Sequence, residues 1–561
     1  MKTFLQPLQN LAEMEEIQKQ AKKNRGILEI SGCMESQKAH LMYGLSGLFP
    51  CHLVIAADEK SAKELYEDYR FYDKRVYYYP AKDLLFFQAD IHGNLLIRQR
   101  MQVIRALLER EDEITVVTSI DGCMDYLVPL EKIEKQLIHF RNDSTLDMDK
   151  LTAALVHMGY ERVGQVEMPG QFSIRGGIID IYSLTEENPW RIELWGDEID
   201  SIRSFDAQSQ RSLENLDDVT IYPAAEQPME KNGVSFLDYF KETETLFFLD
   251  ELNHLEENAK AVQEEFQQSC ENRKEKGEIS LSGDWMCTWE ELCHKINDRN
   301  CVAMSLLDPK KSNWKISGQF NITVKSMSSY QSSFELLVKD LKQYKKEGYQ
   351  IVLLSGSRTR AERLAKDLQE EGLNAFYGQD SDRILQPGEI MVAYGHARRG
   401  FEYPLIKFVV ITEGDMFGGG RGRKKKKKTS YQGKKIQSFS ELSIGDYVVH
   451  ESHGLGIYRG IEKVEVDRVV RDYIKIEYQG GSNLYILATQ LDSLQKYSGG
   501  DASNTPKLNK LGTSEWNKTK SKVRGAVKNI AKELVELYAA RQEKEGYVCG
   551  PDTVWQREFE E

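Results

Sequence analysis

Four short apolar runs punctuate the first 125 residues, and stretches with helical spacing of apolar positions separate them. The runs are Ile27–Ile30, Leu53–Ala57, Val76–Tyr79 and Ile114–Thr118. Apolar runs that alternate with amphipathic helical stretches are typical of βαβ units, whose parallel strands are covered by helices. The pattern therefore predicts an α/β domain with a parallel sheet.

Two later segments carry different patterns. Residues 151–205 are rich in strand formers, and the stretch RIELWGDEIDSI predicts a hairpin around Gly196 and Asp197. The α/β pattern returns between residues 332 and 414, with expected strands at Ile351–Leu354, Ile390–Ala393 and Phe408–Ile411. The chain therefore combines a β-rich domain with a second α/β domain.

Between Ile444 and Tyr497, short alternating runs are separated by turn residues such as His453-Gly454 and Gly480-Gly481. Such spacing predicts a small all-β barrel. A barrel of this size has little room for a buried active site, so its usable surfaces are loops and strand edges. We interpret it as a docking module.

A long helix is expected after the barrel, at about residues 514–545. It carries an apolar stripe at helical spacing, formed by Val523, Val527, Ile530, Leu534 and Leu537. The first half of the helix is basic, and such a charged face is more often solvated surface than a DNA contact.

Composition places the chain among soluble globular proteins with several domains, roughly four by length. Of its 561 residues, 40% are hydrophobic and 29% charged. The eight scattered cysteines favour reduced thiols, and no run approaches the roughly 18 apolar residues of a membrane helix. The amino terminus turns acidic too early for a secretory signal. We expect a cytoplasmic protein.

The net charge of −13 argues against a chain that binds nucleic acid throughout. Basic charge is concentrated in Arg421–Lys428, directly after Gly418–Gly420, which predicts a linker. A solvated tether is the favoured interpretation, and a contact with DNA phosphates is the alternative. No metal site is predicted, because Cys287, Cys293, His294 and Cys301 lack the tight pairs of structural zinc sites.

The turn after the first predicted strand is where a nucleotide-binding loop would be expected. A phosphate-binding loop requires G-x-x-x-x-G-K-[ST]. Here Gly32 and Lys38 fit, but Gln37 replaces the second glycine and Ala39 replaces the Mg²⁺-binding hydroxyl. We also expect no strand ending in an acidic pair, since Val116–Ser119 lacks one. The sequence predicts a degenerate loop that binds no cofactor, or alternatively an ordinary surface lysine at position 38.

Two arginines in the second α/β segment occupy a place where a helicase can present an arginine finger. They are Arg398 and Arg399, in the stretch HARRG. With no bound nucleotide to reach, a structural role is favoured.

Several motifs carry a family resemblance. GGIIDIY and IELWGDEIDSIRSFD resemble the second domain of the UvrB family of excision-nuclease proteins, and YYYPAKDLLFFQADI resembles its first domain. VVHESHGLGIYRGI resembles the RNA polymerase-interacting module of the CarD-like regulators. The order of these pieces, with LGTSEWNKTKSKVRGAVKNIAKELVELYAARQ after the barrel, resembles the amino-terminal half of the bacterial transcription-repair coupling factors.

The resemblance implies a multidomain α/β plus β fold. Its parts are a degenerate P-loop (RecA-like) α/β domain with a β-rich insertion, a second α/β domain, a small SH3/Tudor-like barrel and a long linking helix. The expected boundaries are 1–125 with 215–315 for the first α/β domain, 126–214 for the β-rich domain, 330–417 for the second α/β domain, 418–438 for the basic linker, 439–500 for the barrel, 505–547 for the linking helix and 548–561 for the start of a motor domain.

The resemblance also implies two protein partners. The barrel is expected to dock on the β subunit of RNA polymerase by pairing a strand edge, through Ile461, Lys463, Val464, Glu465 and Val466. The alternative, that Val464 and Val466 only fill the barrel core, stays open at this point.

The β-rich domain is expected to bind the excision-nuclease protein UvrA through Arg162, Arg175 and Phe172. Arginine suits such a surface because its planar fork makes bidentate contacts. For Arg175 the alternative is a local ion pair with Asp180 or Glu193, and for Phe172 it is a place in the core.

By resemblance, the chain is expected to join RNA polymerase stalled at DNA lesions to nucleotide excision repair. ATP, Mg²⁺ and movement along double-stranded DNA belong to the family's motor, of which only the start is expected in this chain, so this chain is predicted not to be an enzyme. The alternatives are an active UvrB-like ATP-dependent DNA helicase and a stand-alone CarD-type regulator.

Overall fold

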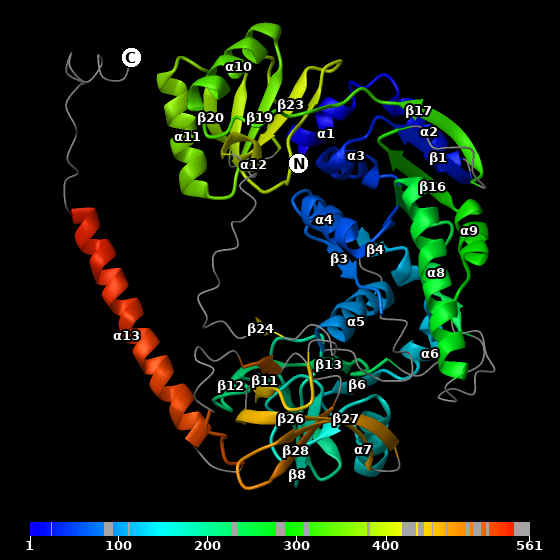
Figure 1. Cartoon of the computed structure of the whole chain (residues 1–561), viewed down its shortest axis with the longest axis vertical. Coiled ribbons are helices and arrows are strands. Elements are labelled where there is room, and N and C mark those ends of the chain that lie inside the picture. Colours follow the sequence, from blue (N-terminus) through cyan, green and yellow to red (C-terminus); the bar gives the residue numbers. More distant parts are fainter. Residues whose placement is uncertain are drawn as a thin grey trace. The chain divides into compact units, whose positions relative to one another are not determined.

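The computed structural model describes most of the chain, in two compact units (Figure 1). One unit consists mainly of Met1–Thr429, and the other of Ser430–Lys463, Tyr473–Leu487 and Asp492–Glu561. The described residues are 1–23, 25–82, 94–109, 113–226, 233–275, 286–307, 314–378, 382–417, 434–435, 442–450, 453–466, 469–487, 494–497, 506–511 and 515–543.

A seven-stranded sheet forms the centre of the first α/β domain, and all of its strand pairs are parallel. The predicted parallel α/β fold is therefore confirmed. In spatial order the strands are β17 (Ile316–Asn321), β1 (Gly26–Ser31), β16 (Asn300–Ser305), β15 (Thr245–Asp250), β2 (Cys51–Ala56), β4 (Ile114–Ser119) and β3 (Val76–Tyr79). The helices of this domain are α1 (Lys2–Leu8), α2 (Met14–Lys23), α3 (Glu35–Ser46), α4 (Glu59–Tyr69), α5 (Asn94–Glu109), α8 (Leu252–Glu275) and α9 (Trp289–Asn297).

The central strands of this sheet are buried on both faces. Along β2, Leu53 and Ile55 join one hydrophobic core, whereas Val54 and Ala56 join the other. Successive side chains of a strand point to opposite faces, and helices cover both faces of a parallel sheet. This double coverage explains why the strands are continuous apolar runs in the sequence.

The β-rich domain is inserted between β4 and β15 of the seven-stranded sheet. Its six strands, in spatial order, are β12 (Ser212–Leu216), β11 (Glu198–Phe205), β10 (Trp190–Trp195), β9 (Ile178–Ile181), β8 (Gln171–Arg175) and β7 (Glu161–Arg162). The shorter elements nearby are β5 (Tyr126–Leu127), β6 (Ile138–Arg141), β13 (Asp218–Ile221), β14 (Val234–Ser235), α6 (Leu130–Glu134) and α7 (Met148–His157). The hairpin expected around Gly196 is present between β10 and β11.

The second α/β domain contains another six-stranded sheet. Its order is β18 (Lys325–Ser326), β22 (Phe401–Tyr403), β23 (Phe408–Thr412), β19 (Gln350–Ser355), β21 (Ile390–Tyr394) and β20 (Ala375–Gly378). Its helices are α10 (Phe334–Glu347), α11 (Arg358–Glu370) and α12 (Glu413–Phe417). Phe401, Tyr403 and Phe408 of this domain share one hydrophobic core with Val54 and Ala56 of the first. The two α/β domains are therefore packed together.

The second unit contains most of an antiparallel sheet and a long helix. The sheet order is β24 (Lys434–Lys435), β29 (Leu494–Lys496), β25 (Tyr447–His450), β26 (Gly454–Val466), β27 (Val469–Glu477) and β28 (Asn483–Leu487). The helix is α13 (Glu515–Glu543), and its predicted stripe from Val523 to Leu537 is exposed. Among the helices that the structure describes, none is long and apolar enough to span a membrane. The basic block and residues 548–561 lie outside the described residues.

Candidate functional sites

The loop between β1 and α3 is tightly packed, and its polar side chains bond to neighbouring protein groups. Gly32 has φ +79°, and a Cβ there would lie 2.1 Å from the carbonyl oxygen of Ile322, so only glycine fits. The Gln37 amide nitrogen donates to the hydroxyl of Tyr403 at 2.7 Å, and its oxygen accepts from the Met34 amide at 3.0 Å. Gln37 therefore fills the start of helix α3 and ties it to the second α/β domain.

Lys38 is held by two carboxylates. Its Nζ lies 2.6 Å from Oδ1 of Asp250 and 2.6 Å from Oε1 of Glu251, and its side chain is 8% exposed. Burial alone would lower the pKa of Lys38, but the two carboxylates outweigh burial and raise it above the ordinary value. The neighbouring Ala39 is fully buried in the core. The interpretation of Lys38 as a surface lysine is therefore wrong.

The prediction that no strand ends in an acidic pair is also wrong. Strand β15 reads TLFFLD, ends at Asp250 and is followed by Glu251. In the sheet, β16 alone separates β15 from β1. In sequence, however, the whole β-rich domain separates β15 from β4, whose end at Ser119 carries no acidic pair. An apolar run followed by Asp-Glu was the signal that could have identified the pair.

Arg398 joins the second α/β domain to helix α4 of the first. Its Nε donates to Oδ2 of Asp68 at 3.0 Å, its backbone amide donates to Oδ1 at 3.0 Å, and a guanidinium nitrogen pairs with Glu64. Ser36 also donates to Asp68, at 2.9 Å. The structural role expected for Arg398 is therefore confirmed. Arg399 is more exposed, and its guanidinium lies 4.0 Å from Glu35.

These residues line a cavity of about 480 Å³ between the two α/β domains. Its cations are Lys38, Arg398 and Arg399. Lys38 and Arg398 already pair with acids from the first domain, and the Arg399 guanidinium lies 4.0 Å from Glu35. In the part of the chain that the structure describes, no group of three or more His, Cys, Asp or Glu residues is arranged to hold a metal ion. The arrangement connects the two α/β domains through hydrogen bonds and ion pairs.

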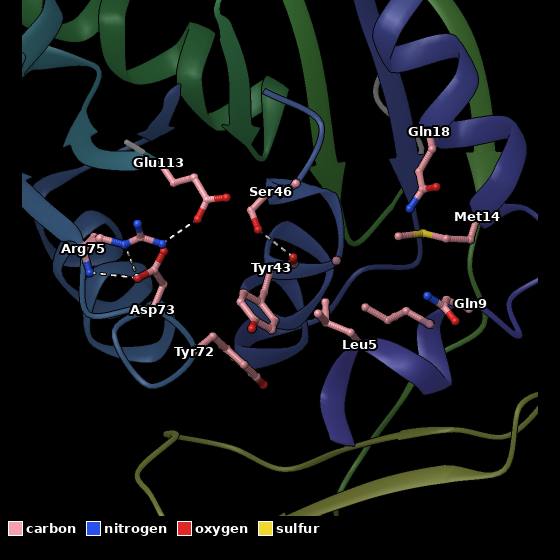
Figure 2. Close-up of a pocket in the computed structure, with 13 residues that line it drawn as sticks. Leu5, Gln9, Met14, Gln18, Tyr43, Ser46, Tyr72, Asp73, Arg75 and Glu113 are labelled. Carbon is pink, nitrogen blue, oxygen red and sulfur yellow. Dashed lines mark hydrogen bonds and ion pairs between the residues drawn. The ribbon is translucent and has the colours of Figure 1, made fainter. Parts of the chain in front are cut away.

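Figure 2 shows another cavity, of about 400 Å³, on the first α/β domain. Arg75 is the single cation among the thirteen residues drawn, and it pairs with Asp73 and Glu113. Tyr43 accepts a hydrogen bond from the amino-terminal ammonium group of Met1 at 3.0 Å. We assign no chemistry to this cavity.

The expected UvrA-binding residues lie in different environments. Arg175, at the end of β8, pairs through Nη2 with Oδ2 of Asp180 at 2.5 Å, as the local alternative predicted, yet its side chain is 44% exposed. Arg162 is exposed on the edge strand β7. Phe172 is 0% exposed and packs in the hydrophobic core. The structure therefore places Phe172 in the core, as its alternative predicted, whereas the two arginines remain accessible.

Trp195 is a candidate interface residue that the sequence pattern did not identify. It ends strand β10 beside the hairpin turn and is 82% exposed. A tryptophan next to a Gly-Asp turn was the available signal, because the last residue before a tight turn has few neighbours to cover it.

The expected polymerase-binding segment is the second half of strand β26. Strand β25 pairs with β26 at Gly454–Ile457, so residues 461–466 continue beyond the end of β25. Ile461 is half-buried and Lys463 is exposed. The side chains of Val464, Glu465 and Val466 lie outside the described part of the structure. Whether the side chains of Val464, Glu465 and Val466 serve the strand edge or the barrel core therefore stays a prediction.

Family models of known protein domains match the two segments that contain the candidate surfaces. A family model described as the UvrB interaction domain matches residues 138–226, and one described as the CarD-like/TRCF RID domain matches residues 442–498. The transcription-repair-coupling factor of Bacillus subtilis (strain 168) is 33% identical over 606 aligned residues, which cover 95% of this chain and 51% of that protein.

Staphylococcal relatives give the same result. The transcription-repair-coupling factor of Staphylococcus haemolyticus is 31% identical over 86% of this chain and 46% of its own length. That of Staphylococcus aureus (strain MRSA252) is 30% identical over 87% of this chain and 46% of its own length. The chain thus spans about half the length of the curated relatives it matches. Over nearly all of its length, this chain is similar to the amino-terminal half of the transcription-repair-coupling factors.

Proposed function

We propose that this chain couples transcription to DNA repair by binding two partners. Its β26 edge docks on the β subunit of RNA polymerase stalled at a DNA lesion, and its β-rich domain recruits nucleotide excision repair through UvrA. The observation that carries the proposal is the presence of both interaction domains in one chain, residues 138–226 and 442–498. The chain would act in the cytoplasm.

The polymerase contact uses main-chain pairing. A strand that continues past its neighbour offers unpaired amide and carbonyl groups to a partner strand. The exposed Lys463 and its neighbours Ile461, Val464, Glu465 and Val466 would set the register. The sheet around them would close into a small SH3/Tudor-like barrel, which keeps this edge rigid.

The first α/β domain is, in this proposal, a degenerate P-loop (RecA-like) domain without a nucleotide. A phosphate loop uses its lysine on the phosphates, and an acid at a strand end helps to hold Mg²⁺. Here Lys38 and Asp250 bind each other, and Gln37 and Ala39 replace the glycine and the hydroxyl. These residues do not fit ATP and Mg²⁺. ATP-driven movement on double-stranded DNA would belong to the part of the relatives that this chain does not span.

Binding measurements with separated partners test the proposal. Immobilised chain should bind RNA polymerase core enzyme and purified UvrA in separate biolayer interferometry runs. Val464→Arg should weaken polymerase binding only, and Arg175→Ala should weaken UvrA binding only. Asn483→Arg, on the edge strand β28, which β27 separates from β26, is the matched control and should bind polymerase normally. Unchanged binding by both interface variants would refute the assigned surfaces.

An ATPase assay separates this function from a helicase. Phosphate release in the presence of double-stranded DNA should stay at background, with or without the Lys38→Ala substitution. Turnover that Lys38→Ala abolishes would support the helicase alternative instead.

A further inference from the structure

Trp195 is exposed in a protein that buries its other described tryptophans of the first unit. Trp190, Trp289 and Trp314 are 7%, 3% and 6% exposed, whereas Trp195 is 82% exposed. Most tryptophan side chains are largely buried, and an indole left in water does not contribute the hydrophobic stabilisation that burial gives. Its position therefore needs an explanation other than folding.

The hairpin that carries Trp195 does not depend on its side chain. Trp195 pairs with Glu198 across a two-residue turn, and Gly196 supplies the positive φ of +66° that such a turn requires. Strand β10 is held instead by the buried Trp190 and Ile192. The indole can be removed with little expected cost to the fold.

Trp195 shares one face of the sheet with the charged residues of neighbouring strands. Along β10 the buried Trp190 and Ile192 alternate with the less buried Arg191, Glu193 and Trp195, which therefore lie on the same face. On this face Asp180 of β9 accepts from Arg191 Nε at 2.7 Å and from Arg175 Nη2 at 2.5 Å.

The hairpin tips also meet. The amide of Leu194 donates to the carbonyl oxygen of Gly177 at 2.8 Å, which joins the tip of the β10–β11 hairpin to that of the β8–β9 hairpin. Arg175 ends β8 at this same tip. Arg175 and Trp195 therefore lie on one face and at one end of the sheet.

We propose that Trp195 is the apolar anchor of the UvrA contact. The inference rests on the proposed function and adds to it the residue that supplies most of the binding free energy. Trp and Arg are the residues most enriched at interface hot spots, where an apolar anchor is surrounded by polar groups that exclude water. Here the polar groups nearest to Trp195 on this face are Glu193 and Arg175, and both lie within the segment that matches the interaction domain.

The partner surface is constrained by this arrangement. It must offer an apolar pocket for the indole and, beside it, a carboxylate for the exposed side of the Arg175 guanidinium. The pairing of Arg175 with Asp180 fixes the direction of the guanidinium before binding, which lowers the entropy lost on association.

The test uses the whole chain and immobilised UvrA. Trp195→Ala should weaken binding on the order of 30-fold, as expected for a hot spot, and Trp195→Phe should retain part of the affinity. Leu213→Ala is the matched control, because Leu213 is also exposed, at 53%, but lies on the outer strand β12. That variant should bind like the wild type.

Thermal unfolding followed by circular dichroism distinguishes an anchor from a folding residue. All three variants should unfold at the wild-type temperature. If the wild-type chain binds UvrA and Trp195→Ala binds it equally well, Trp195 is not the anchor, and the proposed function stands. A wild-type chain that fails to bind UvrA would overturn the proposed function, and the anchor with it. A clear fall in the unfolding temperature of Trp195→Ala would also overturn the anchor, in favour of a folding role.

Discussion

The Lys38 ammonium and the Asp250 carboxylate form a buried ion pair, with Nζ and Oδ1 2.6 Å apart. Lys38 follows strand β1 and Asp250 ends strand β15, and β16 lies between the two strands. A lysine and an acid so placed would serve phosphate and Mg²⁺ in a nucleotide site. Here each satisfies the other, and the pair fixes the loop, the sheet and helix α3 in one arrangement.

Removing the cation of this pair should destabilise the first α/β domain. Lys38→Ala leaves Asp250 and Glu251 without their buried partner, and we expect a loss of about 3 kcal/mol. Urea unfolding followed by tryptophan fluorescence measures the change. Lys60→Ala is the control, because Lys60 is 85% exposed and its Nζ lies 3.9 Å from Glu64, and it should change stability by less than about 0.5 kcal/mol. Equal effects of the two substitutions would contradict the structural role of Lys38.

His40 should make the free energy of unfolding of the first α/β domain depend on pH. It is fully buried, with Nε2 2.8 Å from the carbonyl oxygen of Phe4, and burial lowers the pKa of His40 from 6.5 to about 4. Between these two pKa values the unfolded chain binds a proton that the folded chain does not. This residue should therefore reduce stability by up to about 3 kcal/mol as pH falls from about 6.5 to about 4.

A pair of histidine variants isolates this contribution. His40→Phe should flatten the fall in unfolding free energy between these pH values, because it has no imidazole to protonate. His294→Gln, at a side chain 81% exposed, should keep the wild-type slope. The same slope in all three proteins would rule out His40 as the source.

Gly32 should resist substitution even by alanine. The added Cβ would lie 2.1 Å from the carbonyl oxygen of Ile322 at a backbone φ of +79°. Backbone strain alone costs about 1–3 kcal/mol, and the backbone clash adds to it. Gly47→Ala provides the comparison, since a Cβ there meets nothing within 4 Å. Differential scanning calorimetry should show a lower unfolding temperature for Gly32→Ala only.

Arg398 should hold helix α4 against the second α/β domain. Arg398→Ala leaves the buried Asp68 without its cation and should cost about 2 kcal/mol of local stability. Hydrogen–deuterium exchange in Glu59–Tyr69 should then accelerate by more than about tenfold. Arg399→Ala removes a more exposed side chain 4.0 Å from Glu35 and should leave this exchange unchanged.

Local patterns were sufficient to predict much of the fold. The apolar run Val76–Tyr79 coincides with strand β3, and the helix expected at about 514–545 is α13, Glu515–Glu543. Both patterns arise within one element, where the period of apolar residues reflects which faces are covered.

Relationships between distant segments were harder to predict. The pairing of Lys38 with Asp250 depends on a strand that follows the whole β-rich insertion, so no local pattern contains it. The pairing of Arg175 with Asp180 could be anticipated because the two residues lie on adjacent strands of one short hairpin. The exposure of Trp195 had a local signal in the tight turn that follows it, but the residues that share its face and its end of the sheet are defined only by the assembled strands.

The proposed function requires one chain to hold RNA polymerase and UvrA at the same time. Mass photometry of the wild-type chain with core RNA polymerase and UvrA tests it most directly. We expect a species with the summed mass of all three proteins, which should be lost when Val464→Arg or Trp195→Ala is used and retained with Leu213→Ala. Binary complexes that exclude each other, with no three-protein species at any concentration, would contradict it.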